Sequence, residues 1–224
     1  PWPTYEYFES RLKYSFNKEG DTGKRKEPVL IIDYESFSNP QAKPTQAQLY
    51  ELESKLIGVL NVGVRVDILV PEGIAKNDKV YAILTQLQQD SEGRLILHDI
   101  DAQENARIAI VEEVRKGYSN VQYLLSNAAV NSKESKDLYK MMFKVPAGED
   151  RFQVIRASTL NVVNNFLELI HAAVITHWIF SEIASGNRKE DEEFRRHAGN
   201  FISGSRRFKE YLKKLNVVGA KDVD

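Results

Sequence analysis

Acidic side chains follow two of the apolar segments of this chain. Their carboxylates can bind a cation or act as general acids and bases. Asp33 and Glu35 follow the run that begins at Val29, and Asp99 and Asp101 follow the run "RLIL". Carboxylates that converge repel one another unless a cation neutralises them, and Mg²⁺ prefers oxygen ligands. We expect Glu35, Asp99 and Asp101 to bind Mg²⁺ if they converge.

The same carboxylates also have a purely structural explanation. Strands become polar where they meet solvent, and Asp is a preferred N-cap residue of helices. Asp101 would cap a helix that starts at Ala102. The sequence therefore leaves both interpretations open.

Segments with the composition of strands alternate with segments of helical periodicity. Strands are expected at 28–37, 62–70, 94–100 and 120–126, with helices at 45–60 and 77–89. Helices of this length between strands act as crossover connections, which require parallel pairing. The predicted fold class is α/β, three-layered, with a mainly parallel sheet of four or more strands and a helical C-terminal extension.

Local signals support the two helices of this core. Thr45 is a predicted N-cap of the first helix, and Asn77 or Asp78 of the second. The first helix has one apolar face, which we expect to be buried. That face consists of Leu49, Leu52, Leu56, Val59 and Leu60.

We expect three parts along the chain. An N-terminal helix and charged loop occupy 1–27, the α/β core occupies 28–150, and a helical region at 151–224 packs on the core or forms an oligomer interface. The segment 158–184 is apolar almost all round and must be covered on every side, which predicts a homo-oligomer through this helix. Six amide, imidazole and carboxylate side chains between Val162 and Ile183 predict that it does not span a membrane; they are Asn164, Asn165, Glu168, His171, His177 and Glu182.

Ligands of open parallel sheets bind at the carboxyl ends of the strands, where loops bring side chains from several strands together. We expect a ligand site there. Its predicted residues are Asp33, Glu72, His98, Ser126 and Asn127.

The series "VLIIDYESFSNP", "GVRVDILVP", "ARIAIVEE" and "LLSNAAVNS" resembles the phospholipase D-like sensory domains of prokaryotic regulators, over about 28–145. Enzymes of that superfamily need a His-x-Lys pair, and none of the four histidines here has Lys two positions later. The resemblance implies a non-enzymatic sensory, regulatory or interaction domain of signal transduction, without a cofactor. We prefer this interpretation because it covers more of the chain.

A second resemblance rests on "DYE" and "HDIDAQENARIAI", which are similar in order and spacing to TOPRIM domains. It implies a Mg²⁺-dependent nucleic-acid phosphodiester enzyme with Glu35, Asp99 and Asp101 as metal ligands. That family usually has Gly after the Glu, and this chain has Ser36. The two resemblances differ over 106–112, where the first implies a strand and the second a helix; the alanine, Glu and Gln content favours the helix.

The C-terminal helices, which we expect at 188–202 and 205–215, contain a basic cluster with interleaved aromatic residues, which is typical of a phosphate-binding surface. The alternative is a solvated helix face whose charge is neutralised by the acidic run "KEDEE" at 189–193. The predicted nucleic-acid-binding residues are Arg195, Arg196, Arg206, Arg207, Lys209 and Lys213.

The overall composition excludes several classes of protein. Lys and Arg number 31 against 32 acidic residues, so the chain has no net field that would attract nucleic acid or an anionic membrane. There is no Cys, which excludes disulfides, thiolate metal sites and Cys nucleophiles. This composition fits a reducing compartment, and we expect a cytoplasmic protein.

Overall fold

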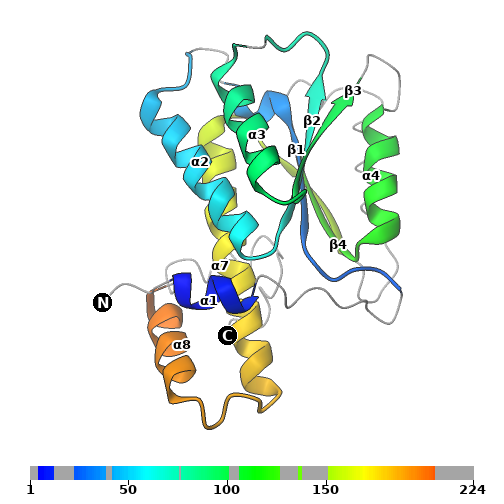
Figure 1. The fold of residues 1–224 in the computed structure, drawn as a ribbon. Coiled ribbons are helices and arrows are strands. Elements are labelled where there is room, and N and C mark those ends of the chain that lie inside the picture. The colour runs from blue at the N-terminus through cyan, green and yellow to red at the C-terminus, as the bar shows by residue number, and fades with distance from the viewer. Residues whose placement is uncertain are drawn as a thin grey trace.

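A computed structural model describes residues 5–12, 23–38, 42–75, 77–100, 106–126, 136–137 and 151–204. The elements alternate between strand and helix over most of this length (Figure 1). They are α1 (Tyr5–Leu12), β1 (Val29–Asp33), the 3-10 turn η1 (Tyr34–Phe37), α2 (Gln46–Asn61), β2 (Arg65–Pro71), α3 (Lys79–Asp90), β3 (Leu95–Ile100), α4 (Ala106–Gly117), β4 (Asn120–Leu125), β5 (Arg151–Arg156), α7 (Leu160–Ala184) and α8 (Glu192–Gly204).

The five strands form one sheet in the order β3-β2-β1-β4-β5, and every neighbouring pair is parallel. The chain builds outward from β1 through β2 to β3, then returns to the other side of β1 to add β4 and β5. The strand order therefore reverses between β1 and β4, which makes their carboxyl ends the topological switch point of the sheet. The prediction of a parallel α/β sheet with at least four strands is confirmed.

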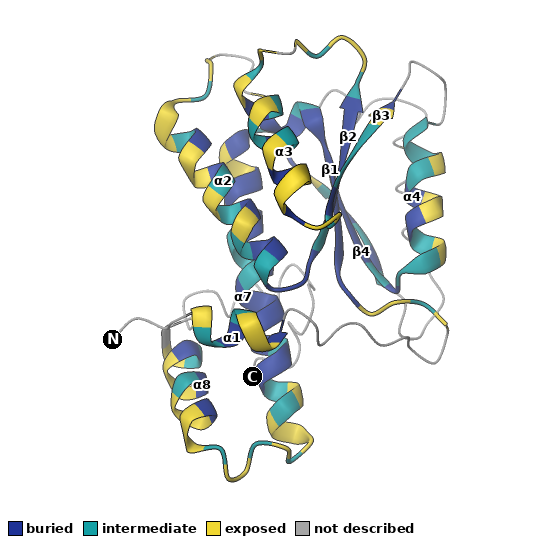
Figure 2. Cartoon of the chain, in the orientation of Figure 1, coloured by how far each residue is buried: buried dark blue, intermediate teal, exposed yellow. Residues whose placement is uncertain are grey.

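Helices cover both faces of the sheet, as Figure 1 shows. One face packs on α2, α3 and α7 and forms the larger core with Leu30, Ile32 and Leu124. The other face packs on α4 and forms a smaller core with Val29, Ile31 and Tyr123. Buried positions line the strands and the inner sides of the helices (Figure 2). This is the expected three-layer arrangement.

Both predicted caps of the core helices are present. The Thr45 side chain accepts a hydrogen bond from the Gln48 amide, and the Gln48 side chain accepts one from the Thr45 amide, which completes a capping box. Asp78, rather than Asn77, caps α3 by accepting from the Tyr81 amide at 3.0 Å. All five apolar residues predicted for one face of α2 are buried.

Two segments differ from the structure predicted from sequence, and a third decides between two alternatives that the sequence left open. The first strand ends at Asp33, and residues 34–37 form a 3-10 turn instead of more strand. Strand β5 was not anticipated; Phe152 and Val154 alternate into the core, as a half-buried strand requires. Residues 106–112 lie in helix α4, so the helix is confirmed and the strand implied by the sensory-domain resemblance is wrong there.

The long apolar helix α7 belongs to the core. By length and composition it could cross a membrane, but 56% of its most apolar window is buried inside the fold. It packs along α2 and contacts α1, α8 and η1. At its far end Phe8, Trp178, Phe194 and Phe201 form a cluster of edge-to-face rings. These contacts agree with the expectation that this helix does not span a membrane.

The helices expected after α7 are described only in part. Helix α8 begins at Glu192, after a turn at 185–190, and not at 188 as expected. The helix expected at 205–215 lies outside the described residues. Of the large apolar side chains of α7, those of Val162 and Ile183 are exposed. Association of the chain through α7 stays a prediction.

Candidate functional site

Asp33 lies at the switch point and is fully buried. The Tyr123 hydroxyl and the Arg107 Nε donate to its Oδ1, the latter at 3.3 Å, and the Ser126 amide donates to its Oδ2 at 2.9 Å. Tyr123 and Ser126 come from β4 and the residue after it, and Arg107 comes from the first turn of α4. A buried carboxylate is tolerated when it is bonded in this way, so Asp33 joins the ends of β1 and β4 to α4.

Glu35 faces the same guanidinium from η1. Its Oε1 accepts from Arg107 Nη2 at 3.3 Å, so one cation bridges the carboxylates of Asp33 and Glu35. Burial raises the pKa of the Glu35 carboxyl, and the charge of Asp33 raises it further, against a backbone hydrogen bond and Arg107, which lower it. We call Asp33, Glu35, Arg107, Tyr123 and Ser126 the acid cluster.

Several buried oxygen atoms at this edge have no partner among the described residues. They are the Ser126 hydroxyl, the Ser36 hydroxyl and Oε2 of Glu35. Buried polar atoms in native proteins are nearly always bonded to protein, water or ligand. These oxygens therefore offer hydrogen-bonding capacity at the switch point that the described side chains do not use.

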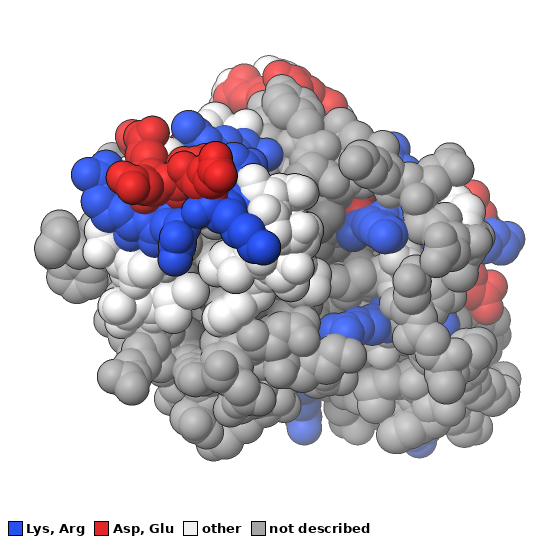
Figure 3. All heavy atoms as spheres, turned by 90° about the horizontal axis from the view of Figure 1, so that it is seen from below, with Lys and Arg blue, Asp and Glu red and all other residues white. Residues whose placement is uncertain are grey.

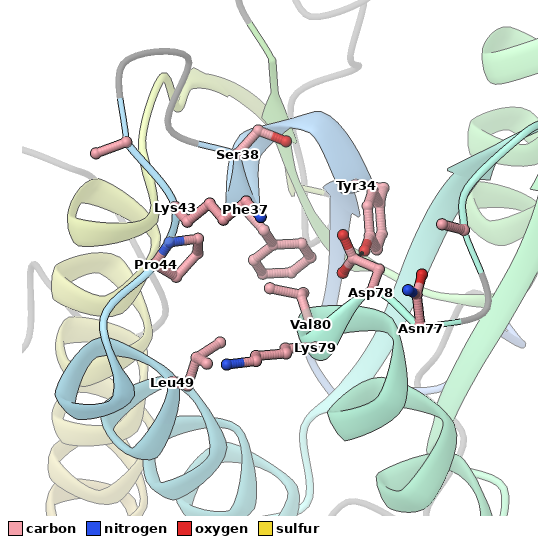
Figure 4. A pocket seen from close by; sticks show the side chains of 12 residues that line it. Tyr34, Phe37, Ser38, Lys43, Pro44, Leu49, Asn77, Asp78, Lys79 and Val80 are labelled. Carbon is pink, nitrogen blue, oxygen red and sulfur yellow. Dashed lines mark hydrogen bonds between the residues drawn. The ribbon is translucent and has the colours of Figure 1, made fainter.

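A cavity of about 520 Å³ opens on the other side of η1, between the start of α2 and the start of α3. Figure 4 shows Tyr34 and Phe37 on its η1 side, with Lys43 and Pro44 entering from the segment before α2. Asn77, Asp78 and Lys79 line it from the α3 side. We call this cavity the η1 pocket; the volume lies within the roughly 300–1,000 Å³ of small-molecule sites.

The back of the η1 pocket is held by a hydrogen bond from the Tyr34 hydroxyl to Asp78 Oδ1, at 2.5 Å (Figure 4). The same oxygen caps α3. Burial raises the pKa of the Tyr34 phenol above its ordinary range, and the hydrogen bond to Asp78 raises it further. Tyr34 is therefore a neutral donor, and its bond fixes the turn η1 against the N-terminus of α3.

The structure brings together only some of the residues predicted from sequence. Asp33 and Ser126 meet in the acid cluster. Glu72 is exposed in the turn after β2, and Asn127 lies outside the described residues. His98 lies on the α4 face two strands away from β1, where its Nε2 is 2.7 Å from Oδ2 of the buried Asp67. The predicted ligand set is therefore spread over separate places.

The residues predicted to bind Mg²⁺ are also described in part. The strand register places Asp99, which is exposed, on the opposite face of the sheet from Asp33. Asp101 lies outside the described residues. Among the described residues, no three His, Asp or Glu side chains are placed to hold one metal ion. Glu35 instead has Arg107 as its cationic partner.

Of the basic C-terminal helices, α8 lies within the described residues. Arg195 and Arg196 are exposed on it, while Arg206, Arg207, Lys209 and Lys213 lie outside the described residues. Seen from below in Figure 3, Lys and Arg side chains surround a cluster of Asp and Glu side chains at one end of the molecule. Between α7 and α8, Arg188 pairs with Glu182 at 3.0 Å and with Asp191 at 3.2 Å. Nucleic-acid binding stays a prediction.

Comparison of the chain with protein-family models and with curated protein sequences finds no match. The two family resemblances drawn from short motifs remain predictions, and the function has to be argued from the site itself.

The sequence did not predict the residues that complete the acid cluster and the η1 pocket. Arg107 looked like an ordinary helix residue, and Tyr34 and Phe37 looked like positions of a strand. The one available signal was Asp78, which was identified as a helix cap but not as a partner of Tyr34. Lys43 and Lys79 gave no signal, because two isolated lysines beside predicted helix starts are common on protein surfaces.

Proposed function

We propose that this chain is a non-enzymatic sensory or regulatory domain that binds a small organic ligand in the η1 pocket. The observation that supports this most directly is the cavity of about 520 Å³ at the carboxyl ends of β1 and β2, with aromatic walls and a few convergent polar groups. Concave, partly apolar sites at this edge of parallel sheets are where ligands of such folds bind.

The turn η1 supports a regulatory role as well as binding. Tyr34 lines the pocket, and the next residue, Glu35, contacts Arg107 on α4 across the sheet edge. A ligand that moved Tyr34 would change the position of Glu35 and so the ion pair with α4. Such a ligand would have different contacts in the two positions of η1, which is what a population shift requires.

Binding is tested with a fragment library, read by ligand-observed NMR, on wild type and on Ala75→Trp. Ala75 is exposed and lines the pocket, so Trp fills the cavity without disturbing the core. Ala82→Trp is the matched control, since Ala82 is exposed on α3 outside the pocket. We expect fragments that bind wild type and Ala82→Trp but not Ala75→Trp. If every fragment binds all three proteins alike, the pocket is not the site.

The regulatory part is tested by hydrogen exchange of α4 amides with and without a bound fragment. We expect exchange in α4 to change in wild type, and the change to be smaller in Glu35→Gln, which lacks the charge that Arg107 contacts. Unchanged exchange in α4 of wild type on binding would contradict a regulatory role but not the binding itself.

A second candidate function is a Mg²⁺-dependent phosphodiester enzyme. The observation that favours it is that the carboxylates of Asp33 and Glu35 both face one cationic group, at 3.3 Å from each. A divalent ion could use the same two carboxylates if Arg107 moved away. The test is cleavage of single-stranded DNA and RNA with Mg²⁺ or Mn²⁺, together with the shift in thermal stability on adding either ion. Activity lost in Glu35→Gln and kept in Glu72→Gln would favour this candidate over the first.

A further inference from the structure

The groups that line the η1 pocket indicate what kind of ligand fits it, an inference that rests on the proposed function. Among the described residues that line it, the side chains that bear a full charge are Lys43, Lys79 and Asp78. Two cationic groups therefore face one carboxylate. Oδ1 of Asp78 accepts hydrogen bonds from the Tyr34 hydroxyl and from the Tyr81 amide, and two lysines against one carboxylate leave a net charge of one positive unit. The charge left for a ligand to meet is positive.

The two lysines approach the pocket from its two walls. Lys43 precedes α2, and its side chain extends toward Phe37 of η1, whereas Lys79 begins α3, and its side chain extends toward Leu49 of α2 (Figure 4). Both residues are exposed. Within the described part of the chain, neither ammonium group has an ion pair or a hydrogen bond. Each keeps three donors for a ligand.

The remaining walls are apolar. The rings of Tyr34 and Phe37 meet edge to face, with centroids 5.9 Å apart. Pro44, Leu49 and Val80 complete this wall. Aromatic side chains favour offset-stacked or edge-to-face contacts with other rings. Asn77 adds one amide that can donate and accept at the rim.

We propose that the ligand of the η1 pocket is a small organic anion: a ring that packs against the wall of Tyr34, Phe37 and Pro44 and bears a carboxylate or phosphate group bound by Lys43 or Lys79. Hydrogen bonds from ammonium groups to an anionic oxygen are stronger than neutral ones. The lysine pair selects the anion, and the aromatic wall selects the ring.

The test uses probes that differ only in charge. Benzoate is compared with benzamide, indole-3-acetate with indole-3-acetamide, and adenosine monophosphate with adenosine, by calorimetry or ligand-observed NMR at low salt. The first two pairs test a carboxylate and the third a phosphate. We expect at least one anion to bind about tenfold or more tightly than its neutral partner. That preference should fall as salt is raised, because the two ammonium groups are exposed.

Variants locate the preference. Lys43→Gln combined with Lys79→Gln should bring the anion and its neutral partner to similar affinity, while Lys116→Gln, an exposed lysine on α4 far from the pocket in sequence, should leave the preference unchanged. Equal binding of the members of every pair would overturn the ligand class while leaving the proposed function in place, and so would binding of none of these probes. The proposed function is contradicted by a different result, namely that no fragment binds at the η1 pocket of the wild-type protein.

Discussion

The turn η1 separates two groups of polar side chains whose charges are satisfied in different ways. On the α4 side, Asp33 is fully buried and has three partners, one of them the Arg107 guanidinium that also holds Glu35. On the α2 and α3 side, Lys43 and Lys79 are exposed at the mouth of a cavity, and neither forms an ion pair with another described residue. Two adjacent residues of η1 therefore belong to different sites: Glu35 belongs to the acid cluster, and Tyr34 lines the η1 pocket.

The difference follows from the energetics of desolvation. A buried charge is costly unless it is paired and hydrogen-bonded, and removing one partner leaves the others unsatisfied. The acid cluster should therefore contribute to stability and resist substitution. Exposed lysines remain hydrated and cost almost nothing, so the η1 pocket should tolerate substitution and lose binding instead. The two sites should respond oppositely to mutation.

The largest expected effect is that of Asp33→Ala. The substitution leaves Arg107 and Tyr123 without their buried acceptor, and breaking a buried ion pair typically costs about 3–5 kcal/mol. Urea denaturation measures the free energy of unfolding. Asp33→Asn, which keeps an acceptor oxygen, should lose less. A loss below about 1 kcal/mol for Asp33→Ala would show that the cluster is not structural, and the contrast between the two sites would disappear.

Asp78→Ala should have an intermediate effect, since Asp78 belongs to both the fold and the pocket. It removes the cap of α3 and the acceptor of Tyr34, each of which contributes about 1 kcal/mol. Urea denaturation should show the combined loss of about 1–2 kcal/mol. Asp78→Asn keeps an N-cap residue and should recover most of it. If Ala and Asn behave alike, the hydrogen bonds of Asp78 do not stabilise the turn.

Glu35→Gln should change how the free energy of unfolding varies with pH more than it changes the magnitude of that free energy at any one pH. Because the pKa of Glu35 is raised in the folded protein, mainly by burial, the folded state holds the proton more tightly than the unfolded state. Its favourable contribution is present below the unfolded pKa and is lost as pH rises through the folded pKa. Unfolding free energies from about pH 4 to pH 8 should therefore decline less with pH in Glu35→Gln than in wild type. Parallel curves would contradict the raised pKa.

The smallest effect on stability is expected for Lys79→Gln. An exposed lysine without an ion pair contributes within about 0.5 kcal/mol, so the urea midpoint should match that of wild type. Binding of an anionic probe should nevertheless weaken, as a titration at low salt would show. A variant that loses stability instead would place Lys79 in the fold and blur the distinction between the two sites.

Much of the fold could be predicted from local patterns. Apolar runs such as that of β1, the caps Thr45 and Asp78, and the apolar face of α2 depend on residues close in sequence, and each was confirmed. Strand β5 was missed because its alternation extends over only six residues. The turn at 34–37 was missed because "YESF" is as aromatic as a strand.

The site could be predicted only in its location. Ligands of parallel sheets bind at the carboxyl ends of the strands, and the sequence pattern indicated which residues lie at those ends. It did not indicate that His98 would pair with Asp67, or that Arg107 would lie between Asp33 and Glu35, because the partners in these pairs are 31, 74 and 72 positions apart. Contacts of that kind depend on strand order and register, which local sequence does not encode.

By itself, then, the sequence determined an α/β chain with parallel strands, capped crossover helices and an apolar helix after them. These follow from hydrophobic periodicity and short-range hydrogen bonding. The tertiary structure decided that β4 lies beside β1, and so that Asp33 meets Ser126, Tyr123 and Arg107. It also decided that the starts of α2 and α3 enclose a pocket with η1. Both depend on how separate elements pack, since burial of whole faces, and not any single segment, sets which strand ends and helix starts become neighbours.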